Sequence, residues 1–160
     1  MTKVLLPGSY DPITRGHIEI ARRAAALFDE VHVVVFINPA KKTLFTPKER
    51  LSLLTVAFEN DPKIKVDANE GLVADYAAAH GISFLLKGVR DETDFSYELP
   101  MADHHLVNCS IDTLLLPTDP RYRTVSSHAV RDALAKGDDL SPYLTDEVAA
   151  AVLAIYRTRR

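Results

Sequence analysis

The sequence predicts an α/β protein in which helices cover both faces of a five-stranded parallel sheet. Five short apolar runs, typical of buried strands, alternate with segments whose apolar residues recur at helical spacing. The second run, residues 31–37, is almost continuously apolar and rich in valine, as expected of a strand covered on both faces. This alternation indicates a doubly wound, Rossmann-like arrangement within a single domain, residues 1–160.

The first half of the chain predicts three strands and three helices. The strands are residues 4–6, 31–37 and 64–68. Thr14 is expected to cap the first helix, and Thr46-Pro47-Lys48-Glu49 has the form of a capping box for the second. A third helix follows Gly71 and is closed by Gly81. Apolar spacing places these side chains inward on the first two helices: Ile18, Ala21, Ala25, Phe28, Leu51, Leu54 and Phe58.

The second half predicts two more strands and three more helical segments. Residues 83–86 and 111–116 are the strands, and a mixed helical segment runs from Asp94 to about Leu106 between them. A loop over residues 118–123 leads to a helix that opens at residues 124–128 and ends at Gly137. The last helix opens at residues 145–147, with Val148, Val152 and Ile155 on one face.

Composition narrows the class of function. The net charge of −3 gives no general affinity for nucleic acid. The single cysteine, Cys109, excludes an intrachain disulfide framework and fits a reducing compartment. No apolar run reaches membrane-spanning length, and Pro7-Gly8 interrupt the first run before it can form a signal-peptide core. We therefore expect a soluble cytoplasmic protein without nucleic-acid or membrane partners.

The stretch from Gly8 to His17 is predicted to be a strand–turn–helix elbow that binds an anion. Gly8 is expected to let the backbone turn tightly and approach a ligand. With Thr14 as the cap, His17 falls in the first helical turn, where unpaired N–H groups and the helix dipole suit a phosphate. The alternative is that His17 is only a capping or surface histidine.

Two pairs of cations follow predicted strands, at the sheet edge where open α/β proteins bind ligands. Lys41 and Lys42 follow the second strand, and Lys87-Gly88-Val89-Arg90 follows the fourth. We interpret both as anion sites, against the alternative of solvated basic loops. Ser126 and Ser127 open a helix and can hold a triphosphate, or can serve as ordinary caps.

The sequence lacks the motifs of two common nucleotide-binding classes. It contains neither G-x-G-x-x-G nor G-x-x-x-x-G-K-[ST]. The fold should therefore not be interpreted as that of a dehydrogenase or a P-loop enzyme.

Thr14-Arg15-Gly16-His17 matches the [HT]-x-G-H signature of nucleotidyltransferases. With it, four blocks resemble the bacterial phosphopantetheine adenylyltransferase family over the whole chain: the elbow, Asn38–Lys42 with Phe45-Thr46 and Glu49-Arg50, Lys87–Glu98, and Val125–Ser127. The resemblance implies transfer of AMP from ATP to 4′-phosphopantetheine, giving dephospho-CoA and pyrophosphate. It also implies magnesium, a hexamer, and competition by coenzyme A as product feedback.

The resemblance also implies site residues. His17 is the expected catalytic residue. The 4′-phosphopantetheine positions are Ser9, Lys41, Val73 and Lys87. The ATP positions are Ser9, Tyr10, His17, Gly88, Val89, Arg90, Glu98, Tyr122, Arg123, Thr124, Val125, Ser126, Ser127 and His128. No protein metal ligands are expected, because Mg²⁺ would come with ATP.

Two positions depart from the family pattern. His128 replaces the third of three consecutive hydroxyl residues, and His105 replaces the asparagine of the acceptor pocket. We hypothesise that the His128 imidazole substitutes for the hydroxyl and makes ATP binding sensitive to pH. The alternative is that His128 points to solvent and the N–H groups of the helix bind the phosphates.

Two other functions remain open from the sequence. One is a related small nucleotidyltransferase with another acceptor, such as nicotinamide mononucleotide. Asp94-Phe95 and Tyr97-Glu98, following Lys87–Arg90, favour the pantetheine branch. The other is a non-catalytic ATP-binding module of the universal-stress type, which would need a late glycine-rich phosphate loop that the sequence lacks.

Overall fold

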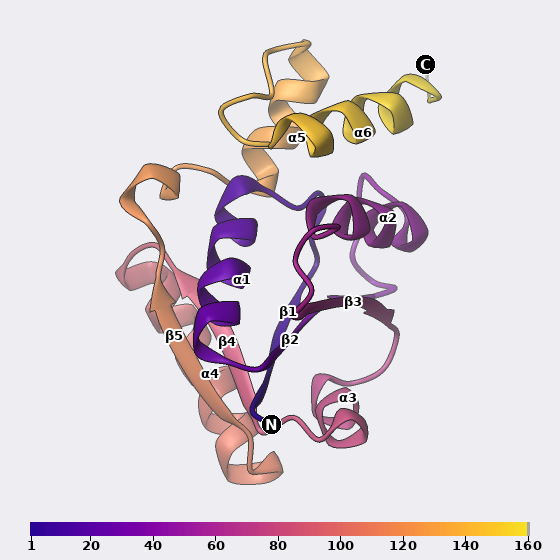
Figure 1. Ribbon diagram of the computed structural model, residues 1–160. Coiled ribbons are helices and arrows are strands. Elements are labelled where there is room, and N and C mark those ends of the chain that lie inside the picture. Colours follow the sequence, from indigo (N-terminus) through magenta and orange to yellow (C-terminus); the bar gives the residue numbers. More distant parts are fainter. Residues whose placement is uncertain (160) are drawn as a thin grey trace.

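The computed structural model describes residues 1–159; Arg160, the last residue of the predicted domain, lies outside the described residues. Five parallel strands form one sheet in the order β3-β2-β1-β4-β5 (Figure 1). They are β1 (Lys3–Gly8), β2 (Glu30–Phe36), β3 (Ile64–Asn69), β4 (Phe84–Val89) and β5 (Asp112–Pro117). The predicted α/β fold with a parallel sheet is confirmed.

Helices cover both faces of this sheet. They are α1 (Arg15–Leu27), α2 (Pro47–Ala57), α3 (Val73–His80), α4 (Glu92–Cys109), α5 (Ser127–Lys136) and α6 (Asp146–Arg157), with a short 3₁₀ helix, η1 (Pro120–Tyr122). Residues of α1, α2, α5 and α6 share the larger core cluster, and residues of α3 pack in a second cluster. Along β1 the faces alternate, because Val4 and Leu6 join the larger cluster and Leu5 joins the second.

The predicted helix caps are confirmed. Thr14 and Thr46 each cap a helix in a reciprocal box, in which the third helical residue hydrogen-bonds back to the cap. Gly81 and Gly137 end α3 and α5 with φ of 65° and 74°, the left-handed region that favours glycine.

Three predicted boundaries and one predicted inward residue are wrong. Lys87 and Gly88 lie inside β4 rather than after it, because backbone pairing with β5 continues as far as Val89. Helix α4 begins at Glu92, capped by Asp91, and ends at Cys109 rather than near Leu106. On α2 the fully buried leucines are Leu53 and the predicted Leu54, whereas Leu51 is only half-buried.

The tight turn of the elbow is also placed differently from the prediction. Gly8 is the last residue of β1, and the left-handed backbone conformation falls on Tyr10, with φ of 47°. A Cβ on Gly8 would lie 3.0 Å from Cε2 of Tyr10. A side chain at this position would have to displace the tyrosine ring, which folds back against the strand.

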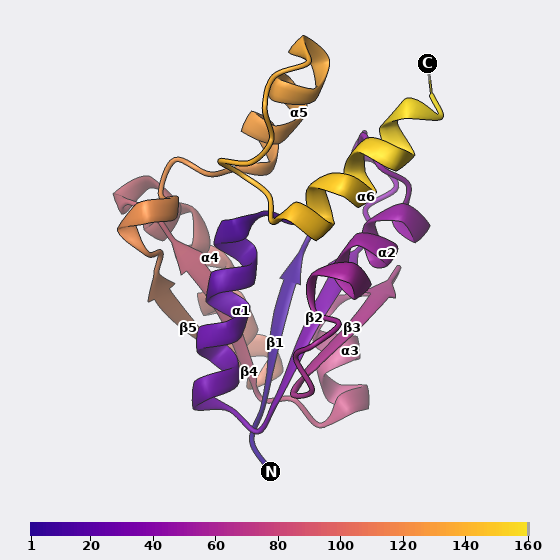
Figure 2. The ribbon, with the colours of Figure 1, turned by 45° about the horizontal axis from the view of Figure 1, so that its top comes forward.

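The topology fixes where a ligand can bind. The chain runs outward from β1 through β2 to β3 and then returns to place β4 on the other side of β1. A crevice opens at this reversal, outside the carboxyl ends of β1 and β4. Figure 2 shows α5 and α6 beyond the carboxyl ends of the strands, away from the N-terminus of the chain. Within residues 1–159 no helix is both long and apolar enough to cross a bilayer.

Candidate active site

A cleft of about 350 Å³ lies at this topological reversal. Its walls come from the carboxyl end of β1, the first turn of α1, the strand β4 and the segment from η1 to α5. Helix α4 supplies Asp94 and Glu98 on the remaining side. Gly88 forms part of the β4 wall, and a Cβ there would lie 3.1 Å from the Ile20 side chain of α1, which would have to shift to accept it.

Most of the predicted site residues line this one cleft, although they come from four separate stretches of the chain. These are Ser9, Tyr10, His17, Lys87, Gly88, Arg90, Glu98, Tyr122, Val125, Ser126 and Ser127. Several other residues line the cleft to which the sequence analysis gave no site role, among them Thr118, Asp94 and Ile20.

Other predicted residues lie outside the lining. Lys41 is exposed, but its Nζ donates a hydrogen bond of 2.8 Å to Oγ of Ser9, which brings the cation to the rim. Val73 opens α3 and packs with the second core cluster. The remaining four are Val89, Arg123, Thr124 and His128.

The His17 imidazole is fixed by the cap of α1. The backbone N–H of Thr14 donates to Nδ1 of His17 at 3.0 Å, so histidine takes the part that Glu or Gln usually has in a capping box. Because a backbone N–H can only donate, Nδ1 must be an unprotonated acceptor. The neutral ring then carries its proton on Nε2, the nitrogen left free to donate to a ligand.

The environment keeps this imidazole neutral. Burial, together with the smaller effect of the positive charges of Lys87 and Arg90, lowers the pKa of His17 from its ordinary 6.5 to about 4. At neutral pH His17 therefore acts as an uncharged hydrogen-bond donor beside two cations.

Tyr10 supports His17 rather than offering a hydroxyl to the cleft. Its Oη donates to the carbonyl of Leu6 at 2.8 Å, and its ring meets the His17 ring edge-on, with centroids 5.1 Å apart. Burial raises the pKa of the Tyr10 phenol well above its ordinary value. Any contact of Tyr10 with a ligand must use its ring or backbone.

The cations of the cleft are balanced by acids of α4. Lys87 Nζ lies 3.5 Å from Glu98, and Arg90 donates from its backbone and guanidinium nitrogens to Asp94. The hydrogen bonds and charge of Asp94 raise the pKa of Arg90, which keeps the guanidinium protonated. An anionic ligand therefore meets charges that are already held in place.

The first turn of α5 presents backbone rather than hydroxyl groups. Ser126 Oγ accepts from the N–H of Ala129 at 3.1 Å, and Ser127 Oγ donates to the carbonyl of Pro12 at 2.7 Å. The N–H groups of Ser127 and His128 have no acceptor within the helix, and they are the free donors of this turn. The His128 side chain is 77% exposed and pairs with Asp132 at 3.2 Å, which agrees with the alternative that it points to solvent.

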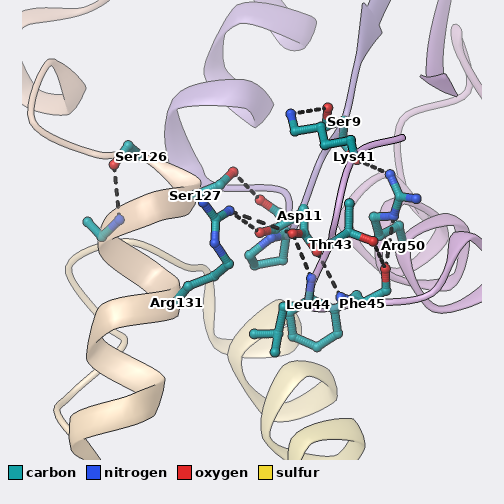
Figure 3. Close-up of polar contacts among 12 residues, drawn as sticks. Ser9, Asp11, Lys41, Thr43, Leu44, Phe45, Arg50, Ser126, Ser127 and Arg131 are labelled. Carbon is teal, nitrogen blue, oxygen red and sulfur yellow. Dashed lines mark hydrogen bonds and ion pairs between the residues drawn. The ribbon is translucent and has the colours of Figure 1, made fainter. Parts of the chain in front are cut away.

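A buried charged network behind the cleft was not anticipated from the sequence (Figure 3). Asp11 and Arg50 are 5% and 3% exposed, and Arg131 of α5 contacts Asp11. Both Asp11 and Arg50 stand inside motifs noted in the sequence. Neither could be given a role there, because the partners of Asp11 lie 33 to 120 residues away and Arg50 reaches Ser9, 41 residues away.

His105, the second departure from the family pattern, is buried on α4. It lies on the same helix that supplies Glu98 to the cleft. Burial lowers the pKa of His105, with smaller contributions from His104 and Lys87. Its Nδ1 finds no hydrogen-bond partner among residues 1–159.

In the described part of the chain, no three His, Cys, Asp or Glu side chains are grouped so as to hold an ion. The carboxylates of the cleft, Asp94 and Glu98, are both engaged by cations.

Comparisons with known proteins agree with this geometry. A family model described as cytidylyltransferase-like matches residues 5–133. The chain is 43% identical over 154 residues to a phosphopantetheine adenylyltransferase of Corynebacterium diphtheriae, covering 96% of this chain and 97% of that one. It is 43% identical over 152 residues to the enzyme of the same name from Frankia alni, covering 92% and 94%. The chain also resembles a crystal structure of a Vibrio parahaemolyticus protein that is provisionally assigned as a nicotinate-nucleotide adenylyltransferase. The TM-score is 0.74 at 18% sequence identity, and the match covers 98% of this chain and 96% of that one. This likeness concerns the fold.

Proposed function

The chain belongs to the phosphopantetheine adenylyltransferase family, within the cytidylyltransferase-like group, and on that premise we propose that it transfers AMP from ATP to 4′-phosphopantetheine. The products are dephospho-CoA and pyrophosphate. The observation that supports this reaction best is the cleft itself, in which two helix N-termini and two cations converge at one sheet edge.

We divide the cleft into an acceptor half and a donor half. In the acceptor half, Ser9, Lys41 and Lys87 receive the phosphate of 4′-phosphopantetheine, and Val73 is assigned to the pantetheine arm on resemblance alone. In the donor half, Gly88, Val89, Arg90 and Glu98 contact the adenylate. Tyr10 and His17, with the segment 122–128, contact the triphosphate. His128 takes part through its backbone N–H.

The chemistry that this arrangement supports is a direct in-line transfer. An oxygen of the acceptor's phosphate attacks the α-phosphorus of ATP, and the bond from that phosphorus to the oxygen of the β-phosphate breaks as pyrophosphate leaves. The attacking phosphate is already ionised at neutral pH, so no general base is needed. The protein positions the two anions and stabilises the charge that accumulates on the phosphoryl oxygens.

His17 is the residue we assign to that stabilisation. Its neutral ring has Nδ1 occupied by the Thr14 N–H, and its Nε2–H can strengthen a hydrogen bond as negative charge develops. The first-turn N–H groups of α5 act in the same way on the departing pyrophosphate.

Magnesium is proposed to enter as part of the substrate, bound to the phosphates of ATP, where it neutralises charge on the phosphoryl oxygens. The engaged state of Asp94 and Glu98 supports this assignment.

The deciding experiment is the release of pyrophosphate from Mg·ATP, measured with and without 4′-phosphopantetheine. We expect release that depends on 4′-phosphopantetheine, with dephospho-CoA appearing in equal amount. Parallel reactions with nicotinamide mononucleotide and nicotinic acid mononucleotide test the other acceptors. Release with one of these and none with 4′-phosphopantetheine would contradict the assignment, and nucleotide binding without release would indicate a non-catalytic module.

The family resemblance supports three further proposals about this chain: assembly as a hexamer, inhibition by coenzyme A in competition with substrates, and a cytoplasmic location. Light scattering on the purified protein tests the first, with six times the chain mass of 17.7 kDa expected. Steady-state inhibition by coenzyme A against each substrate tests the second. Fractionation of cells that express the chain tests the third.

A further inference from the structure

We propose that Asp11 is a positioning residue that sets the separation between the acceptor half and the donor half of the cleft. Its carboxylate holds the acceptor half and its backbone carbonyl holds the donor half. What the two halves bind rests on the proposed function; the contacts of Asp11 do not.

The carboxylate of Asp11 fixes the loop that carries Lys41. Its Oδ2 accepts the N–H of Leu44 at 2.9 Å, and its Oδ1 accepts the N–H of Phe45 at 2.8 Å. These two amides follow Lys41 by three and four residues. Because Lys41 Nζ donates to Oγ of Ser9, the anchored end of the loop determines how this cation meets the elbow.

Arg50 closes the same contact into a ring (Figure 3). Its Nε donates to the carbonyl of Phe45 at 3.1 Å, and its Nη1 donates to the carbonyl of Ser9 at 2.8 Å. Phe45 is thus held at its N–H by Asp11 and at its carbonyl by Arg50, and Arg50 joins it to Ser9. The acceptor phosphate is expected against this ring.

The backbone of the elbow meets α5 on its other side. Nη1 of Arg131 donates to the carbonyl of Asp11 at 2.8 Å, whereas its distance to the Asp11 carboxylate is 3.7 Å. Ser127, in the first turn of α5, donates to the carbonyl of Pro12 at 2.7 Å. The start of α5 is therefore docked mainly on the main chain of residues 11–12, and the Asp11 carboxylate adds only the longer ion pair to Arg131.

Energetics favour a positional role over simple stabilisation. Asp11 and Arg50 are almost wholly buried, and burying charge carries a desolvation cost that well-packed apolar residues would avoid. What a charged ring supplies is one fixed geometry, because Asp11 and Arg50 each hold two backbone groups by hydrogen bonds. In a transfer reaction, a misplacement of about 1 Å can lower the rate by about a hundredfold.

Two substitutions test the acceptor half and the donor half of the cleft separately. Asp11→Asn keeps the shape and the backbone carbonyl but sets an amide NH₂ against one of the two N–H donors. We expect it to raise KM for 4′-phosphopantetheine about tenfold and to change KM for ATP less than about twofold. Arg131→Met removes the bond to the Asp11 carbonyl, so we expect the opposite split, about tenfold on ATP and little on 4′-phosphopantetheine.

Two further variants serve as a control and as an independent test of the KM changes. Asp139→Asn makes the same change where an aspartate accepts two hydrogen bonds from Ser141 at the surface, and both KM values should stay at the wild-type level. Arg50→Lys keeps the positive charge but cannot reach the carbonyls of both Phe45 and Ser9. It should therefore raise KM for 4′-phosphopantetheine as Asp11→Asn does. If Asp11→Asn does not fold, the KM values of Arg50→Lys test the proposal in its place. Equal rises in both KM values for both variants, or no rise in either, would overturn the proposal.

Amide hydrogen exchange provides a test that does not depend on the reaction. At least one of the Leu44 and Phe45 N–H groups, the one that faces the new NH₂, should exchange at least about tenfold faster in Asp11→Asn than in Arg131→Met, because only Asp11→Asn removes an acceptor from this pair. Unchanged exchange in Asp11→Asn would refute the positioning role even in an active enzyme. A wild type that transfers no AMP but shows this exchange pattern would refute the proposed function alone.

Discussion

Helices α1 and α5 begin in similar ways, but the histidine of α1 lines the cleft whereas the histidine of α5 is exposed to solvent. Each helix starts at the cleft with a hydroxyl residue as its cap, Thr14 and Ser126. His17 is the third helical residue of α1, so its ring can reach back to the cap and enter the cleft. His128 is the second of α5, points to the other side of the helix and pairs with Asp132. One position along a helical turn therefore separates a half-buried donor in the cleft from an exposed surface group.

The largest expected effect comes from removing the histidine of the cleft. His17→Ala should lower kcat about a hundredfold or more, because one donor to developing charge is lost. KM for ATP should change much less. A stopped assay of dephospho-CoA formation measures both, and an unchanged kcat would contradict the role of His17.

Removing one cation tests whether the two halves of the cleft bind different anions. Lys87→Ala should weaken 4′-phosphopantetheine binding by roughly tenfold to a hundredfold, the contribution of a hydrogen bond to a charged group, and ATP binding by less. Calorimetry with each ligand gives both values. Equal losses for the two ligands would mean that the halves are not separate in this way. The same variant should also raise the pKa of His17, because a neighbouring positive charge is gone.

The protonation of His17 sharpens the contrast between the two histidines. Because burial depresses its pKa to about 4 in the folded protein, from about 6.5 in an unfolded chain, the folded form binds this proton less tightly. The stability of the protein should therefore decrease as pH falls from about 6.5 to about 4, and His17→Asn should reduce that decrease. NMR titration of the free enzyme should place the His17 midpoint near 4. A midpoint near 6.5 would show that the ring is not held in a dry, cationic setting.

The cap of α5 should matter for stability. Ser126→Ala removes the acceptor for the Ala129 N–H, so we expect a loss of about 1 kcal/mol in the free energy of unfolding. The loss should be accompanied by weaker ATP binding, because the first turn is no longer held at the cleft. Thermal unfolding with and without Mg·ATP measures the two effects. Ser126→Asn, which can still cap, is the matched control.

The exposed histidine should give the smallest effect. His128→Ser should change ATP affinity less than about twofold, since its side chain is exposed and pairs only along its own helix. Affinity curves measured from pH 5 to pH 8 should superimpose for wild type and variant. A flattened curve in the variant would restore the hypothesis that the imidazole contacts the triphosphate.

Much of the fold was predictable because its signals are local. Apolar runs located all five strands, and the caps at Thr14, Thr46, Gly81 and Gly137 were correctly placed, since a cap depends on residues within one turn. Errors arose where pairing between distant segments decided the outcome. Strand β4 continues through Lys87 and Gly88 because β5 lies beside it, and no property of those two residues reveals that neighbour.

The candidate site shows the same difference between features set by local sequence and features set by contacts between distant segments. The sequence by itself determined the elbow, the cations and the serines, because each motif is contiguous and its chemistry is evident from its residue types. Tertiary structure alone decided that His17 is neutral and His128 exposed, since both depend on what surrounds the ring. It also decided that Asp11 and Arg50 form one buried ring, because their contacts join residues that are 33 to 41 positions apart. Local spacing fixes how a helix starts, whereas only packing fixes which charges are taken out of water.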